Sequence, residues 1–324
     1  MAAATDPCRR LTRPQATCRC RPLPPPAAAV TTGLSLCSST FVCGSSSFSR
    51  CRSPPPAKGS TKLFSPSAVN PSHRVPEVDR EQLAVYKSGS GKFDEFYGAK
   101  ATLNVYGFPN LKGQESSSAV IWILNNADNQ LNVITTGWHV YPELYGDTQT
   151  HFFTLWAVDE QSSTGCYNLQ CNGFVLQNAT SIVPGVVLNP VSTVDGPQYE
   201  VTIKVFKDPT SGDWWLYFGH DDNLNPVGYW PKSLFTSLAN KATRVDFGGQ
   251  VTFPKSDTGP PMGSGHFPED HKAAYFKDTN YIDKNGGFFL PDNPDFRVDS
   301  PDCYNLGGFD TDHFLYGGPG GCTN

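Results

Sequence analysis

The chain has 324 residues with 25 Lys and Arg against 30 Asp and Glu, a formal net charge of −5. This charge is divided unevenly, because residues 1–76 hold ten basic residues and one acid, whereas the remainder holds 15 basic and 29 acidic residues. An acidic body excludes a nucleic-acid partner, which needs a basic face. No apolar run approaches the roughly 18 residues of a membrane span, so we expect a soluble chain with no membrane partner.

Residues 1–77 form a leader rich in Pro, Ser, Ala, Arg and Cys. Such a composition buries too little apolar area to offset the entropy of ordering, so we predict that this leader is disordered. It lacks the apolar stretch of about 7–15 residues that a secretory signal requires. Three origins stay open: a plastid transit peptide, an upstream stretch joined to the domain by a gene model, or a genuine disordered tail.

The remaining domain, 78–324, contains many short runs rich in Val, Ile, Thr and aromatic residues. These residue types favour strands, and Gly, Pro and Asp turn signals separate the runs. Almost no stretch has helical spacing, so the domain is predicted to be all-β, a large antiparallel β-sandwich. The expected strands are 101–106, 118–124, 132–136, 151–156, 174–177, 199–206, 214–218, 243–247 and 250–253.

Four cysteines lie in this domain as two local pairs, Cys166 with Cys171 and Cys303 with Cys322. In an acidic, loop-rich body they predict two disulfides and an oxidising compartment, with four free thiols as the alternative. The spacings do not suit a zinc site, so no metal is expected. Asn178 begins an acceptor sequon for N-glycosylation.

One stretch, 231–242, has the spacing of a short helix, with Leu234, Leu238 and Ala242 four residues apart and Pro231 in the first turn. Most tryptophans of the domain are expected to pack in the core rather than to form a ligand platform. They are Trp122, Trp156, Trp214, Trp215 and Trp230.

A series of motifs in this order resembles the neprosin family of plant glutamic peptidases over about residues 81–324. They are Tyr97–Val105, Gly137–Asp147, Thr164–Val175, Val227–Pro231, Met262–Phe267 and Tyr316–Pro319. The resemblance implies a β-sandwich with a long cleft, the same two disulfides, and a secreted endopeptidase that works in acid and cuts after proline. It implies no cofactor, and we expect a monomer with a peptide or polysaccharide ligand in the cleft.

The two positions of the family's catalytic glutamates carry other residues here. The resemblance places the first glutamate two residues before Gly137, where this chain has Thr135, and the second directly after Gly248 and Gly249, where it has Gln250. An amide can still hydrogen-bond an oxyanion. A threonine hydroxyl cannot activate water without a base beside it, and a general base typically contributes about 10²–10⁴-fold. We therefore expect a homologue that has lost hydrolysis by the family mechanism.

Two alternatives stay open. A substitute acid could support weak or altered prolyl endopeptidase activity; Asp246 shares a strand face with Gln250, and Glu143 and Asp147 lie in an expected loop. The domain could instead bind carbohydrate through exposed aromatic residues in the cleft. The resemblance also suggests a structural or cleft-rim role for His266.

Overall fold

The structure of the chain is a computed structural model that describes residues 80–88, 95–127, 130–159, 164–177, 180, 182–292 and 294–323. The predicted leader 1–77 and the predicted glycosylation site Asn178 lie outside these residues. No helix among the described residues is long and apolar enough to cross a membrane.

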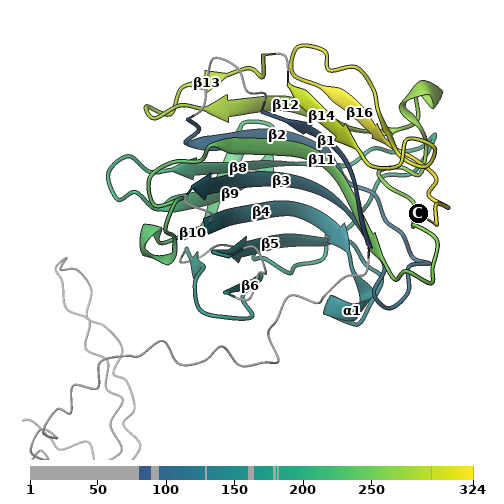
Figure 1. Cartoon of the computed structure of the whole chain (residues 1–324), viewed down its shortest axis with the longest axis horizontal. Coiled ribbons are helices and arrows are strands. Elements are labelled where there is room, and N and C mark those ends of the chain that lie inside the picture. The colour runs from purple at the N-terminus through teal and green to yellow at the C-terminus, as the bar shows by residue number, and fades with distance from the viewer. Residues whose placement is uncertain are drawn as a thin grey trace, which may run out of the picture. The chain divides into compact units, whose positions relative to one another are not determined.

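Two antiparallel sheets make up the fold, as the sequence predicts (Figure 1). The seven-stranded sheet has the order β14 (Asp295–Val298), β1 (Arg80–Lys87), β11 (Arg244–Phe253), β3 (Ser116–Ala127), β4 (Gln130–Val140), β5 (His151–Ala157) and β6 (Gly165–Tyr167). The nine-stranded sheet has the order β15 (Asn305–Leu306), β16 (Phe314–Gly317), β12 (Ala274–Ile282), β2 (Gly98–Asn104), β8 (Glu200–Lys207), β9 (Trp214–His220), β10 (Asn223–Trp230) and β7 (Val175–Leu176), with β13 (Phe288–Phe289) paired to β12.

The core lies between the sheets and takes alternate residues from each strand. On β11, Val245, Phe247 and Val251 are fully or almost fully buried in the core, whereas Asp246 and Gln250 face the other side of the sheet. Side chains from both sheets join one hydrophobic cluster. Trp156, Trp214 and Trp230 belong to it as expected, but the expectation is wrong for Trp122 and Trp215, which are only partly buried.

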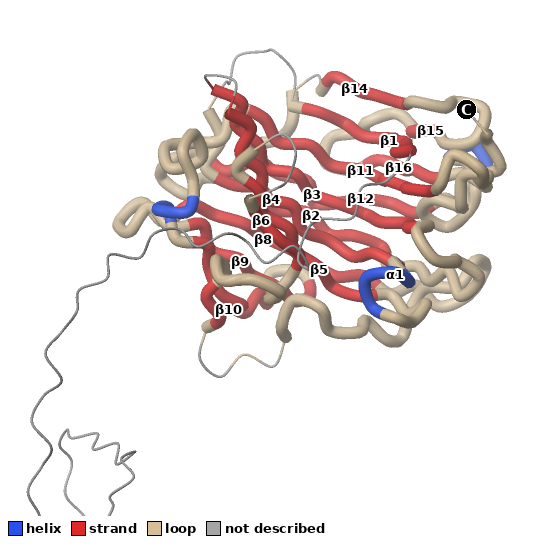
Figure 2. Tube along the Cα trace, turned by 60° about the horizontal axis from the view of Figure 1, so that its bottom comes forward, coloured by secondary structure: helices blue, strands red, loops and turns tan. Residues whose placement is uncertain are grey.

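Among the described residues one short α-helix is present, but its predicted position is wrong. The helix is α1 (Pro142–Tyr145), at the end of the sheet where β4 leads to β5 (Figure 2). Residues 231–242 contain only the 3₁₀ turn η2 (Lys232–Leu234), and a second such turn is η3 (Pro268–Asp270).

Side chains from the neighbouring sheets explain why 231–242 does not form a helix. The Asn132 side-chain oxygen accepts hydrogen bonds from the backbone N–H groups of Thr236 and Leu238, at 2.8 and 3.2 Å. The Trp214 indole donates to the Leu238 carbonyl at 2.9 Å. These bonds satisfy backbone groups that a helix would otherwise pair within itself, so tertiary contacts override the local pattern.

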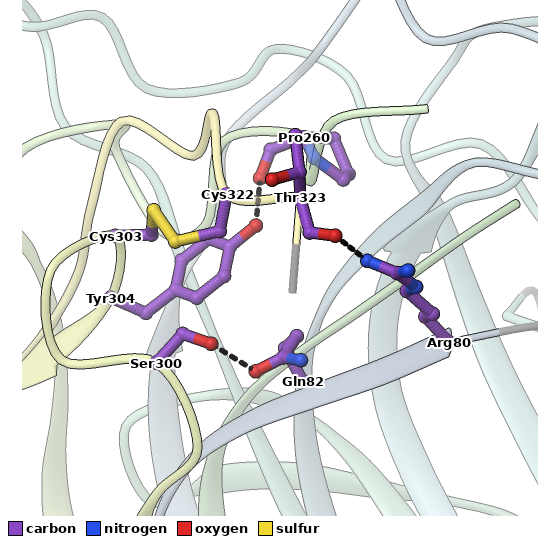
Figure 3. Close-up of a disulfide and its surroundings, with 8 residues drawn as sticks. All are labelled: Arg80, Gln82, Pro260, Ser300, Cys303, Tyr304, Cys322 and Thr323. Carbon is purple, nitrogen blue, oxygen red and sulfur yellow. Dashed lines mark hydrogen bonds between the residues drawn. A yellow bond between two sulfur atoms is a disulfide. The ribbon is translucent and has the colours of Figure 1, made fainter. Parts of the chain in front are cut away.

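Both predicted disulfides form. Cys166–Cys171 has a Cα–Cα distance of 6.1 Å and Cys303–Cys322 one of 5.9 Å. Figure 3 shows the second bridge beside Tyr304, whose hydroxyl donates to the Pro260 carbonyl. The bridge therefore ties the C-terminal segment to the body of the domain.

Candidate functional site

The outward face of the seven-stranded sheet carries a cleft of about 450 Å³. Strand alternation supplies its floor, because Asp246, Gln250 and Thr252 of β11 line the cleft while Phe247 and Val251 between them are buried in the core. The lining residues are Glu81, Leu83, Val85, Ser116, Ser118, Trp122, Leu124, Leu131, Val133, Thr135, His139, Tyr141, Phe153, Leu155, Tyr167, Arg244, Asp246, Gln250, Thr252 and Arg297.

The two positions at which the resemblance implies catalytic side chains both line this cleft. Thr135 on β4 lies opposite Trp122 of β3, which in turn lies opposite Asp246 of β11. Gln250 lies opposite Ser118 of the same central strand. Thr135 and Gln250 therefore project from strands on either side of β3, with their side chains on the same face of the sheet.

Two glycines occupy the row of the sheet between these two positions. Gly137 and Gly248 flank Val120 in the intervening row of the sheet. A Cβ on Gly137 would lie 1.9 Å from the Ala119 carbonyl oxygen, and one on Gly248 would lie 2.3 Å from the Ala84 carbonyl oxygen. Neither site can hold a side chain without displacing the backbone of the neighbouring strand.

Thr135 is buried at the base of the cleft, and no hydrogen bond joins its hydroxyl to a carboxylate within the described residues. Asp246, in the same row, is nearly fully buried. It accepts hydrogen bonds from Arg244 Nε at 2.8 and 2.9 Å. Burial raises the pKa of Asp246 above its ordinary value, and Arg244 offsets part of that rise. The Asp246 carboxylate is thus already paired with Arg244, and Trp122 lies between it and Thr135.

Gln250 has a carboxylate neighbour that the sequence did not reveal. Its side-chain amide donates a hydrogen bond to Glu81 on β1, and its backbone carbonyl accepts one from the Ser118 hydroxyl at 3.0 Å. The hydroxyls of Ser116 and Thr252 bond each other at 2.6 Å. This end of the cleft is therefore a polar cluster with one carboxylate, Glu81.

His139 forms part of the cleft wall. Its ring stacks on Phe153 with centroids 4.0 Å apart, and its Nε2 lies 2.7 Å from the Tyr145 hydroxyl. That hydroxyl also accepts a hydrogen bond from the Asn168 amide at 2.8 Å. Burial holds the pKa of His139 well below its ordinary value, so the imidazole is neutral near neutral pH.

The other two candidate acids do not line the cleft. Asp147 lies 3.0 Å from His151 Nε2, and the His151 ring stacks on Tyr145 with centroids 3.7 Å apart. Glu143 lies in the first turn of α1. Asp147 thus helps to hold the ring that supports His139, and neither acid is placed beside Thr135.

The remaining predicted site residues lie outside the lining. Gly249 faces the core, where a Cβ would lie 2.4 Å from the Met262 sulfur. His266 lies on a turn, 3.5 Å from Asp270. Among the described residues, no group of three or more His, Cys, Asp or Glu side chains could hold a metal ion.

Comparison with known proteins gives one family and several distant structures. A sequence model of the neprosin family matches residues 113–319, more than half of the chain. Scytalido-glutamic peptidase with a peptide-based transition state analog is similar at 11% identity and a TM-score of 0.39, covering 74% of this chain and 98% of that one. SCP-B, a member of the eqolisin family in complex with the tripeptide Ala-Ile-His, is similar at 11% identity and a TM-score of 0.37, with the same coverage.

Proposed function

Because the chain belongs to the neprosin family, we propose that it is a peptidase homologue that binds peptides in its cleft but does not hydrolyse them through the family's two catalytic positions. The observation that carries this proposal is the placement of Thr135. It lies in the cleft where the resemblance implies a glutamate, and no described carboxylate bonds to its hydroxyl. The cleft is retained while the acid at that position is absent.

The chemistry of the two positions supports a non-hydrolytic role. Attack of water on a peptide carbonyl needs a base to take the water proton, and neither a threonine hydroxyl nor a glutamine amide is basic. Asp246 is engaged by Arg244 and lies beyond Trp122. Loss of the base alone lowers the rate by about 10²–10⁴-fold.

The lining of the cleft favours a proline-rich peptide. Aromatic and aliphatic side chains cover most of the wall, including Trp122, Phe153 and Tyr167. Aromatic-lined grooves suit proline-rich segments, because the extended polyproline conformation loses little entropy on binding. A polysaccharide ligand is less well supported, since a close group of outward rings (Trp215, Tyr217 and Tyr229) lies on the nine-stranded sheet instead of in the cleft.

We also propose that the protein acts outside the cell. The two disulfides persist in oxidising compartments, and family membership agrees with an extracellular site.

A binding assay run beside a cleavage assay tests the proposed function. The full chain is mixed with a capped, fluorescent proline–glutamine heptapeptide at about pH 4–5, where a glutamate pair could act. We expect the wild-type chain and Thr135→Ala to bind the peptide without cutting it, whereas the double variant Thr135→Glu/Gln250→Glu cuts it. A wild-type chain that cleaves the peptide, with Thr135→Ala inactive, would contradict the proposal, and so would a chain that binds no proline-rich peptide.

A further inference from the structure

Glu81 differs from the other charged side chains of the cleft in its partners. The charged lining residues are Glu81, Arg244, Asp246 and Arg297. Arg244 pairs with Asp246, and Arg297 Nε lies 2.6 Å from Asp299. Within the described part of the chain, no ion pair is formed by Glu81, whose only hydrogen-bond partner through its side chain is the neutral amide of Gln250.

The side chains that lie across the sheet from Glu81 are polar and uncharged. Its neighbours across the sheet are Gln250 and the hydroxyl pair Ser116 and Thr252. Burial raises the pKa of Tyr167, on the far wall, to about 12, and the negative charge of Glu81 adds to that rise. Tyr167 is therefore a neutral hydroxyl and does not neutralise the carboxylate.

Gln250 donates a hydrogen bond to this carboxylate and, being neutral, does not repel it. The Ser118 hydroxyl bonds the Gln250 carbonyl, while the Gln250 amide donates to one Glu81 oxygen. A carboxylate accepts about four hydrogen bonds, so Glu81 keeps capacity for a further donor. A second carboxylate at position 250 would instead repel Glu81 and cause one of the two to take up a proton.

We propose that Glu81, oriented by Gln250, is the subsite that receives a positively charged nitrogen of the bound peptide, either an ammonium or a guanidinium group. This inference rests on the proposed peptide-binding function and adds the class of ligand. An ionised acceptor makes its strongest hydrogen bonds with charged donors, and the cleft supplies no such donor to Glu81. The acidic body, with 15 basic and 29 acidic residues after position 76, attracts cationic peptides as well.

The experiment compares three capped heptapeptides of proline and glutamine with a central lysine, norleucine or glutamate. Binding to the full chain is measured by fluorescence anisotropy at about pH 6, where glutamate is ionised. We expect the lysine peptide to bind roughly 1.5- to fivefold more tightly than the norleucine peptide, the range of a solvent-accessible ion pair. Glu81→Gln should remove that difference between the lysine and norleucine peptides.

A matched control is Glu269→Gln, which neutralises an exposed glutamate on η3, outside the cleft lining. It should keep the full preference for lysine. An uncapped norleucine peptide tests whether Glu81 also recognises a terminal ammonium group. If it binds more tightly than the capped peptide, and Glu81→Gln removes this gain, the proposal is supported for a terminal ammonium.

Three results would overturn the inference. In the first, the norleucine peptide binds but the lysine peptide gains nothing, which leaves the proposed function intact. In the second, Glu81→Gln keeps the preference for lysine. In the third, Glu81→Gln leaves binding unchanged but abolishes a slow cleavage, which would make Glu81 a catalytic base. Failure of every peptide to bind would remove the proposed function as well.

Discussion

At the scale of single residues, the sheet that carries the cleft depends on positions where nothing larger than glycine fits. The Cβ that an alanine would add at Gly137 meets the Ala119 carbonyl oxygen at 1.9 Å, and this oxygen belongs to the neighbouring strand. A side chain at this point would push β4 away from β3. Gly137 thus permits the close pairing of β3 and β4, the strands that carry Ser118 and Thr135.

Gly137→Ala is therefore expected to destabilise the domain strongly. Overpacking against side chains typically lowers the free energy of unfolding by about 1–3 kcal/mol, and a backbone contact relaxes less, so we expect at least about 3 kcal/mol. Gly308→Ala is the control, because a Cβ there has no neighbour within 4 Å. Its effect should stay within about 0.5 kcal/mol. Urea unfolding measures both, and similar midpoints for the two variants would contradict the argument.

At the scale of elements, the strands were predictable and the helix was not. Period-two alternation survives in β11 because one face packs in the core and the other lines a cleft. Residues 231–242 do not form the helix that their spacing predicts, because Asn132 and Trp214 of distant strands hydrogen-bond to their backbone. Local pattern carries no information on such partners.

The same limit explains the part of the site that the sequence missed. Thr135 and Gln250 could be identified because short motifs around them resemble the neprosin family. Glu81 could not, since it reaches Gln250 only through the pairing of β1 with β11, across a separation of 169 residues. Alternation predicts which face a residue takes, but it does not predict which strand lies beside it.

His139 of β4 contacts Tyr145 of α1 in the cleft wall, and its titration should make the stability of the domain depend on pH. Burial depresses the pKa of His139 in the folded state, so below about pH 6.5 the unfolded chain binds more protons than the folded one. This part of the stability is present above pH 6.5 and is lost as the pH falls, with a slope of at most about 1.4 kcal/mol per pH unit for one proton.

His139→Gln removes this titration while keeping a polar side chain. Urea unfolding between about pH 5 and 7 should give a flatter dependence of stability on pH for the variant than for the wild-type chain. Equal slopes would show that His139 is already protonated in the fold or that it titrates normally.

At the scale of the whole domain, the first described strand is joined to the last described residues. Arg80 donates to the Thr323 carbonyl, and the Ser300 hydroxyl donates to Gln82 at 2.6 Å, beside the Cys303–Cys322 bridge (Figure 3). β1 also lies between β11 and β14. The strand that carries Glu81 is thus held by contacts from the C-terminal segment, so the cleft is completed only when β1 and that segment are both in place.

The two disulfides should therefore differ in their contribution to stability. Cross-linking restricts the unfolded chain more when the closed loop is longer, and the separations are 19 residues for Cys303–Cys322 and 5 for Cys166–Cys171. The chain-entropy relation gives about 3 kcal/mol for the longer loop and about 2 kcal/mol for the shorter one. Thermal unfolding of Cys303→Ala/Cys322→Ala and Cys166→Ala/Cys171→Ala tests this order. A larger drop in Tm on loss of the shorter bridge would show that native contacts around Cys166 and Cys171 outweigh loop entropy. The C-terminal segment would then contribute less to stability than its contacts with β1 indicate.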